Sequence, residues 1–209
     1  MADSEDSRND QPLHLMSRPE MCLDFANTLA YRGSSRIESI HNFDELVRWC
    51  GDSGVTPSAL AARLREWSGR HPKRTLEIFT AAISLRELVY RIFHALASGA
   101  PPDDDELDQL NDAMRETPAR TLVARTDDGF GWEVENAKPS VHLILAPVLW
   151  SAADLLVGPQ RARLRECSND KCLWLFLDDS KNGTRRWCSM QACGNRAKAH
   201  RHYLRHKND

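Results

Sequence analysis

Cys167-Ser-Asn-Asp-Lys-Cys172 and Cys188-Ser-Met-Gln-Ala-Cys193 are two cysteine pairs with the same internal spacing, and fifteen residues separate them. Four thiolates supplied as two close pairs are a ligand set that Zn2+ takes in tetrahedral structural sites. Because the chain supplies all four ligands, no coordination position stays open for a catalytic water. The spacing therefore predicts one structural zinc ion held by Cys167, Cys172, Cys188 and Cys193.

The residues between and after the pairs favour a small zinc domain. We expect a strand over 173–177, a turn over 178–183 and a returning strand over 185–188, followed by a helix that Ser189 caps and that runs to about 205. A knuckle, a β-hairpin and a helix that carries the last ligand describe a treble-clef-like finger. Core cysteines or a disulfide pair are the alternatives, and the two equal spacings argue against both.

The part of the chain before Gly158-Pro159 predicts a mainly α fold. Apolar residues recur at helical spacing, and caps such as Asn42 with Glu45 mark the ends of helices. On either side of Asp127-Asp128-Gly129 the helical spacing of apolar residues gives way to a strand-like pattern, which predicts a β-hairpin. Helices are expected over 19–31, 42–51, 56–69, 72–98, 103–116 and 139–157, and strands over 121–126 and 130–135.

Net charge differs sharply between the two parts of the chain. The whole chain has 28 Lys and Arg against 30 Asp and Glu, a formal net charge of −2. Residues 159–209 carry 12 Lys and Arg against 5 Asp and Glu, which gives +7, and residues 1–158 carry −9. Four thiolates around Zn2+ contribute −2, so about +5 remains on the folded finger. A basic finger keeps nucleic-acid binding open although the whole chain is nearly neutral.

Composition and the remaining cysteines bear on compartment and activity. The chain is 41% hydrophobic and 28% charged, as expected of a soluble globular protein. The polar start lacks the features of a signal peptide, and the longest apolar run, 141–157, is too short to span a membrane. We therefore expect a cytoplasmic protein with reduced thiols, in which Cys22 and Cys50 pack in the core. We expect no enzyme, because no Gly-rich phosphate loop, nucleophile elbow or paired-His motif is present.

The C-terminal motifs resemble those of a known family. The chain from 167 to 203 resembles the CGNR zinc finger, and Cys22-Leu-Asp-Phe-Ala-Asn-Thr-Leu29 resembles the opening helix of the ABATE domain that typically precedes it. The matching segments are Trp174-Leu-Phe176-Leu-Asp178, Ser180-Lys181-Asn182, Arg185-Arg186-Trp187-Cys188-Ser189-Met190, the CGNR motif Cys193-Gly194-Asn195-Arg196, and the helix with Lys198, Arg201 and Tyr203.

The sequence predicts a domain division, and the resemblance implies a function. The polar, acidic start predicts a disordered leader over 1–15, and the change of charge at Gly158-Pro159 marks a boundary between domains over 16–158 and 159–209. The resemblance implies that the first is an ABATE-like helical domain that senses a ligand and the second a CGNR finger. It also implies a bacterial protein of the stress-induced transcription-regulator group. A lone finger reads few bases, so a specific regulator favours a homodimer, although no heptad run marks an interface.

Two sets of residues are candidate contacts. Cations on the last helix and on the loop before it match a DNA footprint: Lys181, Arg185, Arg186, Arg196, Lys198, Arg201 and Arg205. A solvated basic face is the alternative, and for Asn195 and Arg196 we favour a structural role near the zinc. Trp174, Phe176 and Trp187 are expected in the core of the finger rather than as base-stacking platforms.

The polar face of the first helix is the second set. Its residues would line a small-ligand pocket, with solvated surface as the default interpretation: Asp24, Asn27, Thr28, Tyr31 and Arg32. The leading hypothesis is a zinc-containing, DNA-binding transcription regulator with a ligand-sensing N-terminal domain. The alternative is a protein-interaction or intramolecular docking module that does not bind DNA, and an enzyme ranks third.

Overall fold

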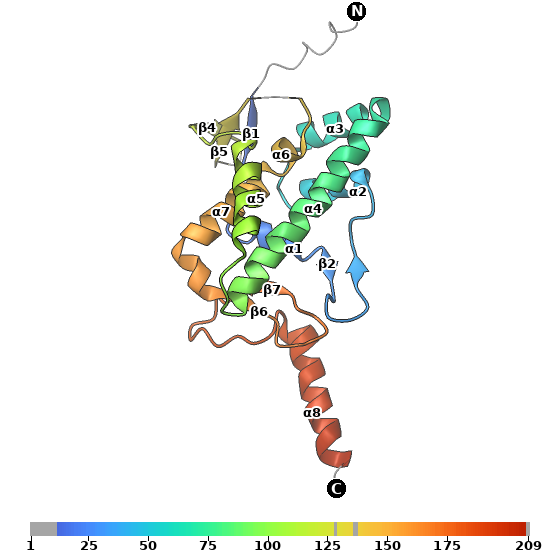
Figure 1. Cartoon of the computed structure of the whole chain (residues 1–209), viewed down its shortest axis with the longest axis vertical. Helices are drawn as coiled ribbons and strands as arrows, with labels where there is room; N and C mark the ends of the chain where they lie inside the picture. The colour runs from blue at the N-terminus through green and yellow to red at the C-terminus, as the bar shows by residue number, and fades with distance from the viewer. Residues whose placement is uncertain (1–11, 128, 136–137, 208–209) are drawn as a thin grey trace, which may run out of the picture.

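The computed structural model describes residues 12–127, 129–135 and 138–207. Figure 1 shows a helical body crossed by one long helix, with a last helix that extends away from it. The long helix is α4 (Pro72–Ala97), and the other helices of the body pack around it: α1 (Met21–Ala26), α2 (Phe43–Asp52), α3 (Ser58–Arg70), α5 (Asp104–Arg115), α6 (Val141–Ile144) and α7 (Ala146–Val157). The expected mainly α fold is confirmed. Within the described residues, none of the helices has the length and apolar character needed to cross a membrane.

The sheets of the body are small. Strands β4 (Leu122–Thr126) and β5 (Gly129–Val134) form the expected hairpin. β1 (Leu13–Leu15) adds to the free side of β5, so the strand order is β1-β5-β4. Residues 12–15 therefore differ from the predicted disordered leader, because Leu13 and Leu15 alternate with His14 and turn one buried face to the core. The rest of that leader lies outside the described residues.

Two expected helices are shorter or divided. α1 ends at Ala26 rather than near Tyr31, because Thr28 donates its hydroxyl hydrogen to the Phe25 carbonyl oxygen and so competes with the helix. The chain then forms β2 (Leu29–Ala30), which pairs with β3 (Ile37–Glu38). The expected helix over 139–157 divides into α6 and α7 at Leu145, just before Pro147, which has no N–H to continue the first helix.

The finger follows a 3-10 turn, η1 (Pro159–Arg163), and contains β6 (Leu164–Glu166), β7 (Leu175–Leu177), η2 (Met190–Gly194) and α8 (Asn195–Lys207). β7 pairs with β6. The sequence had predicted residues 185–188 as its partner, so that prediction is wrong. The first cysteine pair thus lies in the β6–β7 connection. Residues 185–188 contact this connection instead, since the Ser168 N–H donates to the Arg186 carbonyl at 2.8 Å.

Strand β7 joins two hydrophobic clusters because its side chains alternate between its faces. Leu175 packs with Leu164 in the large core of the helical body. Phe176 packs instead with the cysteines of the finger. The finger is therefore attached to the body through its own hairpin.

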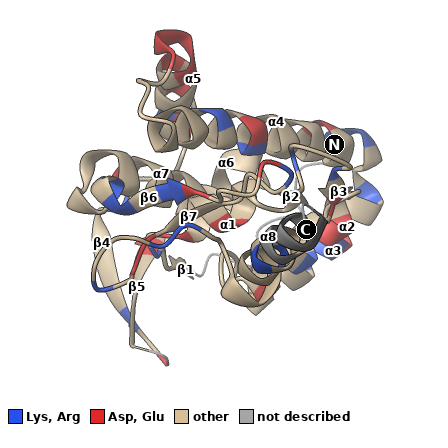
Figure 2. Ribbon diagram, turned by 90° about the horizontal axis from the view of Figure 1, so that it is seen from below, with Lys and Arg blue, Asp and Glu red and all other residues tan. Residues whose placement is uncertain are grey.

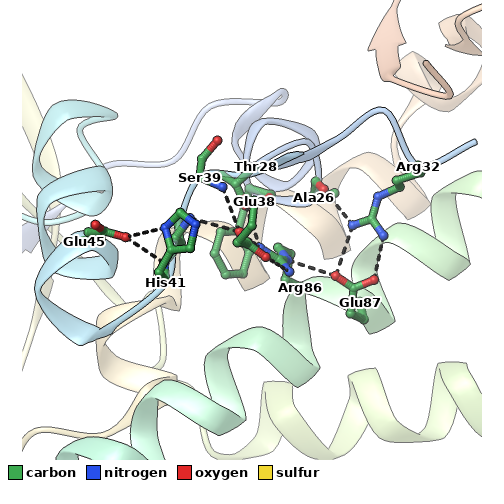
Figure 3. Close-up of polar contacts among 11 residues, drawn as sticks. Ala26, Thr28, Arg32, Glu38, Ser39, His41, Glu45, Arg86 and Glu87 are labelled. Atoms are coloured by element: carbon green, nitrogen blue, oxygen red, sulfur yellow. Dashed lines mark hydrogen bonds and ion pairs between the residues drawn. The ribbon is translucent and has the colours of Figure 1, made fainter. Parts of the chain in front are cut away.

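A buried ionic network lies on α4 (Figure 3). The Arg86 side chain is 2% exposed and donates to Glu38 at 2.6 and 2.8 Å and to Glu87 at 2.9 Å. Glu87 also accepts from Arg32 at 2.6 Å. Burial alone would raise the pKa of Glu38 and of Glu87, but the hydrogen bonds and charges of Arg86 and Arg32 outweigh it and lower both. Their contribution to stability is therefore present above the unfolded pKa of about 4.3 and is lost as the pH falls through the lower folded values.

Arg86→Ala is predicted to destabilise the protein strongly, because it removes the cation that pairs with Glu38 and one of the two that pair with Glu87. Removing one partner of a buried ion pair costs about 3–5 kcal/mol in the free energy of unfolding. Urea unfolding of the zinc-loaded protein measures this loss. Arg91→Ala is the matched control: Arg91 lies on the same helix in a pair with Glu106 but is 50% exposed, so its loss should cost less than about 1 kcal/mol. Equal costs for the two variants would contradict the assignment.

Candidate metal centre and domain interface

The four cysteine sulfurs form a cluster of the size that zinc requires. All four Sγ atoms lie within 4.8 Å of one another. Cys188 Sγ lies 3.7 Å from the sulfurs of both Cys172 and Cys193. A Zn–S bond of about 2.3 Å in a tetrahedron gives an S···S edge of about 3.8 Å. The predicted ligands therefore fit one structural zinc ion.

The electrostatics of the cluster also call for a cation. Hydrogen bonds from Cys172 and Cys188 lower the pKa of the Cys167 thiol, because they stabilise its thiolate. The contact with the Cys167 thiolate raises the pKa of Cys172 and of Cys188, because an ionised sulfur disfavours a second negative charge beside it, so these two thiols keep their protons. A dication would replace these protons, so zinc binding releases them and is weakened at low pH.

The residues around the last ligand hold it by short-range contacts. Asn169 donates its side-chain N–H to Cys193 Sγ at 3.3 Å. Ser189 caps η2, a single π-turn, by accepting from the Ala192 N–H. A Cβ on Gly194 would lie 2.7 Å from the Met190 sulfur, so glycine allows Met190 to pack closely here.

Arg185 braces the finger from within. Its guanidinium donates to the carbonyl oxygens of Trp187 and Cys188 and lies 4.6 Å from the Phe176 ring centroid. Its backbone N–H donates to buried Asp178, whose pKa is lowered mainly by the hydrogen bond from Ser180. The DNA contact expected of Arg185 stays a prediction, and in the structure its guanidinium donates to the chain itself.

The side chain of Asn27 joins the two domains. Its amide N–H donates to the Leu175 carbonyl at 2.8 Å, and its amide oxygen accepts from the Leu175 N–H at 3.0 Å. Asn27 is only 4% exposed. Its side-chain amide therefore pairs with the backbone of β7 as a neighbouring strand would, although Asn27 lies at the end of α1. The finger is thereby held in one orientation on the body.

Helix α4 and the loop after β2 complete this interface. Tyr90 donates its hydroxyl hydrogen to the Leu173 carbonyl at 3.2 Å, and His94 bonds to Glu166. Desolvation raises the pKa of Tyr90 to about 12, so the hydroxyl stays a donor near neutral pH. Gly33 lies so close to the knuckle that a Cβ would be 1.8 Å from the Asp170 carbonyl oxygen. The sequence analysis did not identify Tyr90, His94 or Gly33 as interface residues. For Tyr90 and His94, their polar groups within the apolar pattern of α4 were a usable signal.

The predicted ligand-binding face is largely occupied by protein contacts. Asn27 binds β7, Thr28 accepts from Arg86, and Arg32 pairs with Glu87 and lies 3.7 Å from the Tyr90 ring centroid. Asp24 pairs with Arg18 on the surface. Most of the polar groups on this face therefore have partners within the protein, and the small-ligand pocket expected there stays a prediction. Tyr31 lines a cavity next to the finger.

The predicted DNA-contacting residues divide into groups. Lys181, Arg186 and Lys198 are exposed. Arg196 is exposed as well, but it donates to the Tyr31 hydroxyl at 2.8 Å, and this bond raises its pKa. Arg201 and Arg205 lie on α8, and their side chains are outside the described part.

The finger's aromatic residues and Asn195 have structural contacts. Phe176 is buried and Trp187 half-buried against the cysteines, as expected, while Trp174 is 36% exposed. Asn195 donates to the Gln191 carbonyl, a structural contact next to the metal. Asp154 of α7 is exposed and pairs with Arg120 at 2.6 and 2.8 Å.

The fold and the cysteine cluster define a helical protein with a C-terminal zinc finger. Residues 20–159 match the model of the ABATE family, described as "Putative stress-induced transcription regulator". Residues 163–206 match the CGNR zinc finger. The chain belongs to the ABATE family and carries a CGNR zinc finger, as its motifs had suggested. No curated protein matches the chain.

Metal analysis of the purified protein should find one zinc ion per chain. Cys172→Ser should lose it and unfold the finger, because metal binding and folding are coupled in such domains. The helical body should keep most of its circular-dichroism signal, since its large core contains none of the four ligand cysteines. Ser168→Ala, an exposed neighbour in the same knuckle, should keep the ion. Protein without zinc, or a finger that stays folded in Cys172→Ser, would contradict the metal assignment.

Gly33→Ala should loosen the finger from the body, because its new Cβ collides with the backbone of the knuckle. Overpacking of this kind costs about 1–3 kcal/mol. Limited proteolysis should show faster cleavage within 164–190. Gly69→Ala is the control, since nothing lies within 4 Å of a Cβ there and alanine favours its helix. Equal protease sensitivity of the two variants would show that Gly33 is not part of a tight interface.

Proposed function

We propose that this protein is a DNA-binding transcription regulator and not an enzyme, in which the finger contacts DNA and the helical domain senses a small ligand or stress signal. The observation that carries the proposal is the direction of α8. Its first turn touches the body through Arg196 and Tyr31, and the helix then runs away from it (Figure 1). This helix contains five Lys and Arg and no Asp or Glu.

The size and charge of α8 suit a duplex groove. A helix of 13 residues is about 20 Å long at 1.5 Å per residue. The major groove of DNA is about 12 Å wide and admits an α-helix. Figure 2, seen from below and so nearly along α8, shows Lys and Arg on this helix and the acidic start of α5 well away from it in that view.

Two exposed cations precede the helix in the chain. Lys181 and Arg186 are exposed on the loop between β7 and η2. Cations of this kind contact phosphates and set the position of a protein on DNA, whereas base edges are read by fewer side chains. With Arg185 bound to the chain itself, we assign the phosphate contacts to Lys181, Arg186, Lys198, Arg201 and Arg205.

A protein-docking module is the second candidate, and the domain interface favours it. Asn27, Tyr90 and Gly33 already use one side of the finger for intramolecular docking. In this alternative the opposite, basic side would bind an acidic protein partner. The same interface suits regulation, because a signal received by the body would reach the finger through these contacts.

Binding to a mixed-sequence duplex should weaken steeply with salt. Five phosphate contacts give a slope of log K against log salt of about −4 to −5. The triple variant Lys198→Ala, Arg201→Ala, Arg205→Ala should reduce this slope by roughly 3 units. Fluorescence anisotropy at several salt concentrations measures both slopes.

The matched control removes the same charge elsewhere. Arg70, Lys73 and Arg74 are exposed where α3 meets α4, and replacing all three with alanine should leave the slope unchanged. Absence of binding by the wild-type protein at low salt would contradict DNA binding and favour the docking alternative. Equal slopes for the two triple variants would show that α8 does not contact the duplex.

A further inference from the structure

A cavity of about 270 Å3 lies where the helical domain meets the finger. Ala30 and Tyr31 line it from the body, and Trp174 and Ala192 line it from the finger, together with three of the four cysteines. The space is far larger than a single zinc ion bound at about 2.3 Å from the sulfurs needs, and Ala30, Tyr31, Trp174, Ser189 and Ala192 form its other walls. The cavity therefore extends beyond the metal centre.

The backbone is strained on both sides of this cavity. In the described part of the chain, Tyr31 and Leu173 are the two non-glycine residues with positive φ, at 53° and 55°. Leu173 lies between two lining residues, Cys172 and Trp174. Tyr90 holds this strained segment by bonding to the Leu173 carbonyl. Such conformations persist where the surrounding structure enforces them and are frequent at ligand clamps.

The walls define the chemistry of an occupant. The rings of Tyr31 and Trp174 with the methyl groups of Ala30 and Ala192 suit a flat aromatic ring. The thiolate side carries the negative charge of a zinc–tetrathiolate centre, so an anionic group cannot point toward it. Arg196 lies over the Tyr31 ring with its centre 5.4 Å from the centroid and is exposed. A carboxylate pointing outward would meet this guanidinium.

We propose that this cavity binds a small aromatic acid, with the ring between Tyr31 and Trp174 and the carboxylate paired with Arg196. The site joins residues of both domains, so an occupant would alter how the finger sits on the body. That the cavity is the sensing site of the regulator rests on the proposed function. That the cavity binds aromatic acids rests only on its shape and on the charges around it.

NMR titration of the zinc-loaded, 15N-labelled full chain with benzoate tests the proposal. Benzoate should cause saturable shifts at Tyr31, Ala192 and the Trp174 indole. Benzylamine, which carries the same ring with a positive charge, should cause none. Arg196→Gln should raise the benzoate Kd roughly tenfold, and Ala192→Leu, which fills the cavity, should abolish binding. Arg36→Gln, an exposed arginine of the loop after Tyr31, should leave Kd unchanged.

The outcomes separate this inference from DNA binding. Shifts that do not saturate, or equal binding of benzylamine, would overturn the site whether or not the protein binds DNA. Benzoate binding that Ala192→Leu leaves intact would also overturn it. Saturable benzoate binding in a protein that does not bind duplex DNA would support the site and remove the proposed function.

Discussion

The side-chain amide of Asn27 pairs with both backbone groups of Leu175, a residue 148 positions further along the chain. A buried amide left without partners costs about 1–3 kcal/mol, so Asn27 is stable in its place only while the finger is docked. In return, the finger's strand gains a fixed partner. Zinc shapes the finger, but this pair fixes how the finger sits on the body. The direction of α8, and with it the surface offered to a partner, depends on that orientation.

The interface also explains how opposite charges coexist in one chain. The docked side of the finger uses apolar packing at Leu175 and mostly neutral hydrogen bonds such as that of Tyr90. Arg185 serves the finger's own carbonyls. Lys181, Arg186 and Lys198 are exposed, and the near-neutral total charge describes neither domain.

Local chemistry could be predicted from the sequence, and long-range pairing could not. The cysteine spacing identified the metal centre because a short chelate loop depends only on nearby residues, and the cap at Asn42 followed for the same reason. The predicted strand partner of β7 was wrong. Both β6 and residues 185–188 lie close to β7 in sequence, and the burial of Leu164 in the large core favours β6 as the partner. Asn27 was predicted to line a ligand pocket, but the partner that the structure gives it, Leu175, lies in the other domain, which no local pattern reveals.

Amide hydrogen exchange of the zinc-loaded full chain, with and without duplex DNA, tests the central claim most directly. The account holds that the finger stays docked while α8 and the loop before η2 bind DNA. Added DNA should therefore slow exchange in 181–186 and 195–207 and leave 173–177 unchanged. Protection gained or lost at 27–34 and 173–177, with none in α8, would show that the docked surface and not the projecting helix is the one that binds.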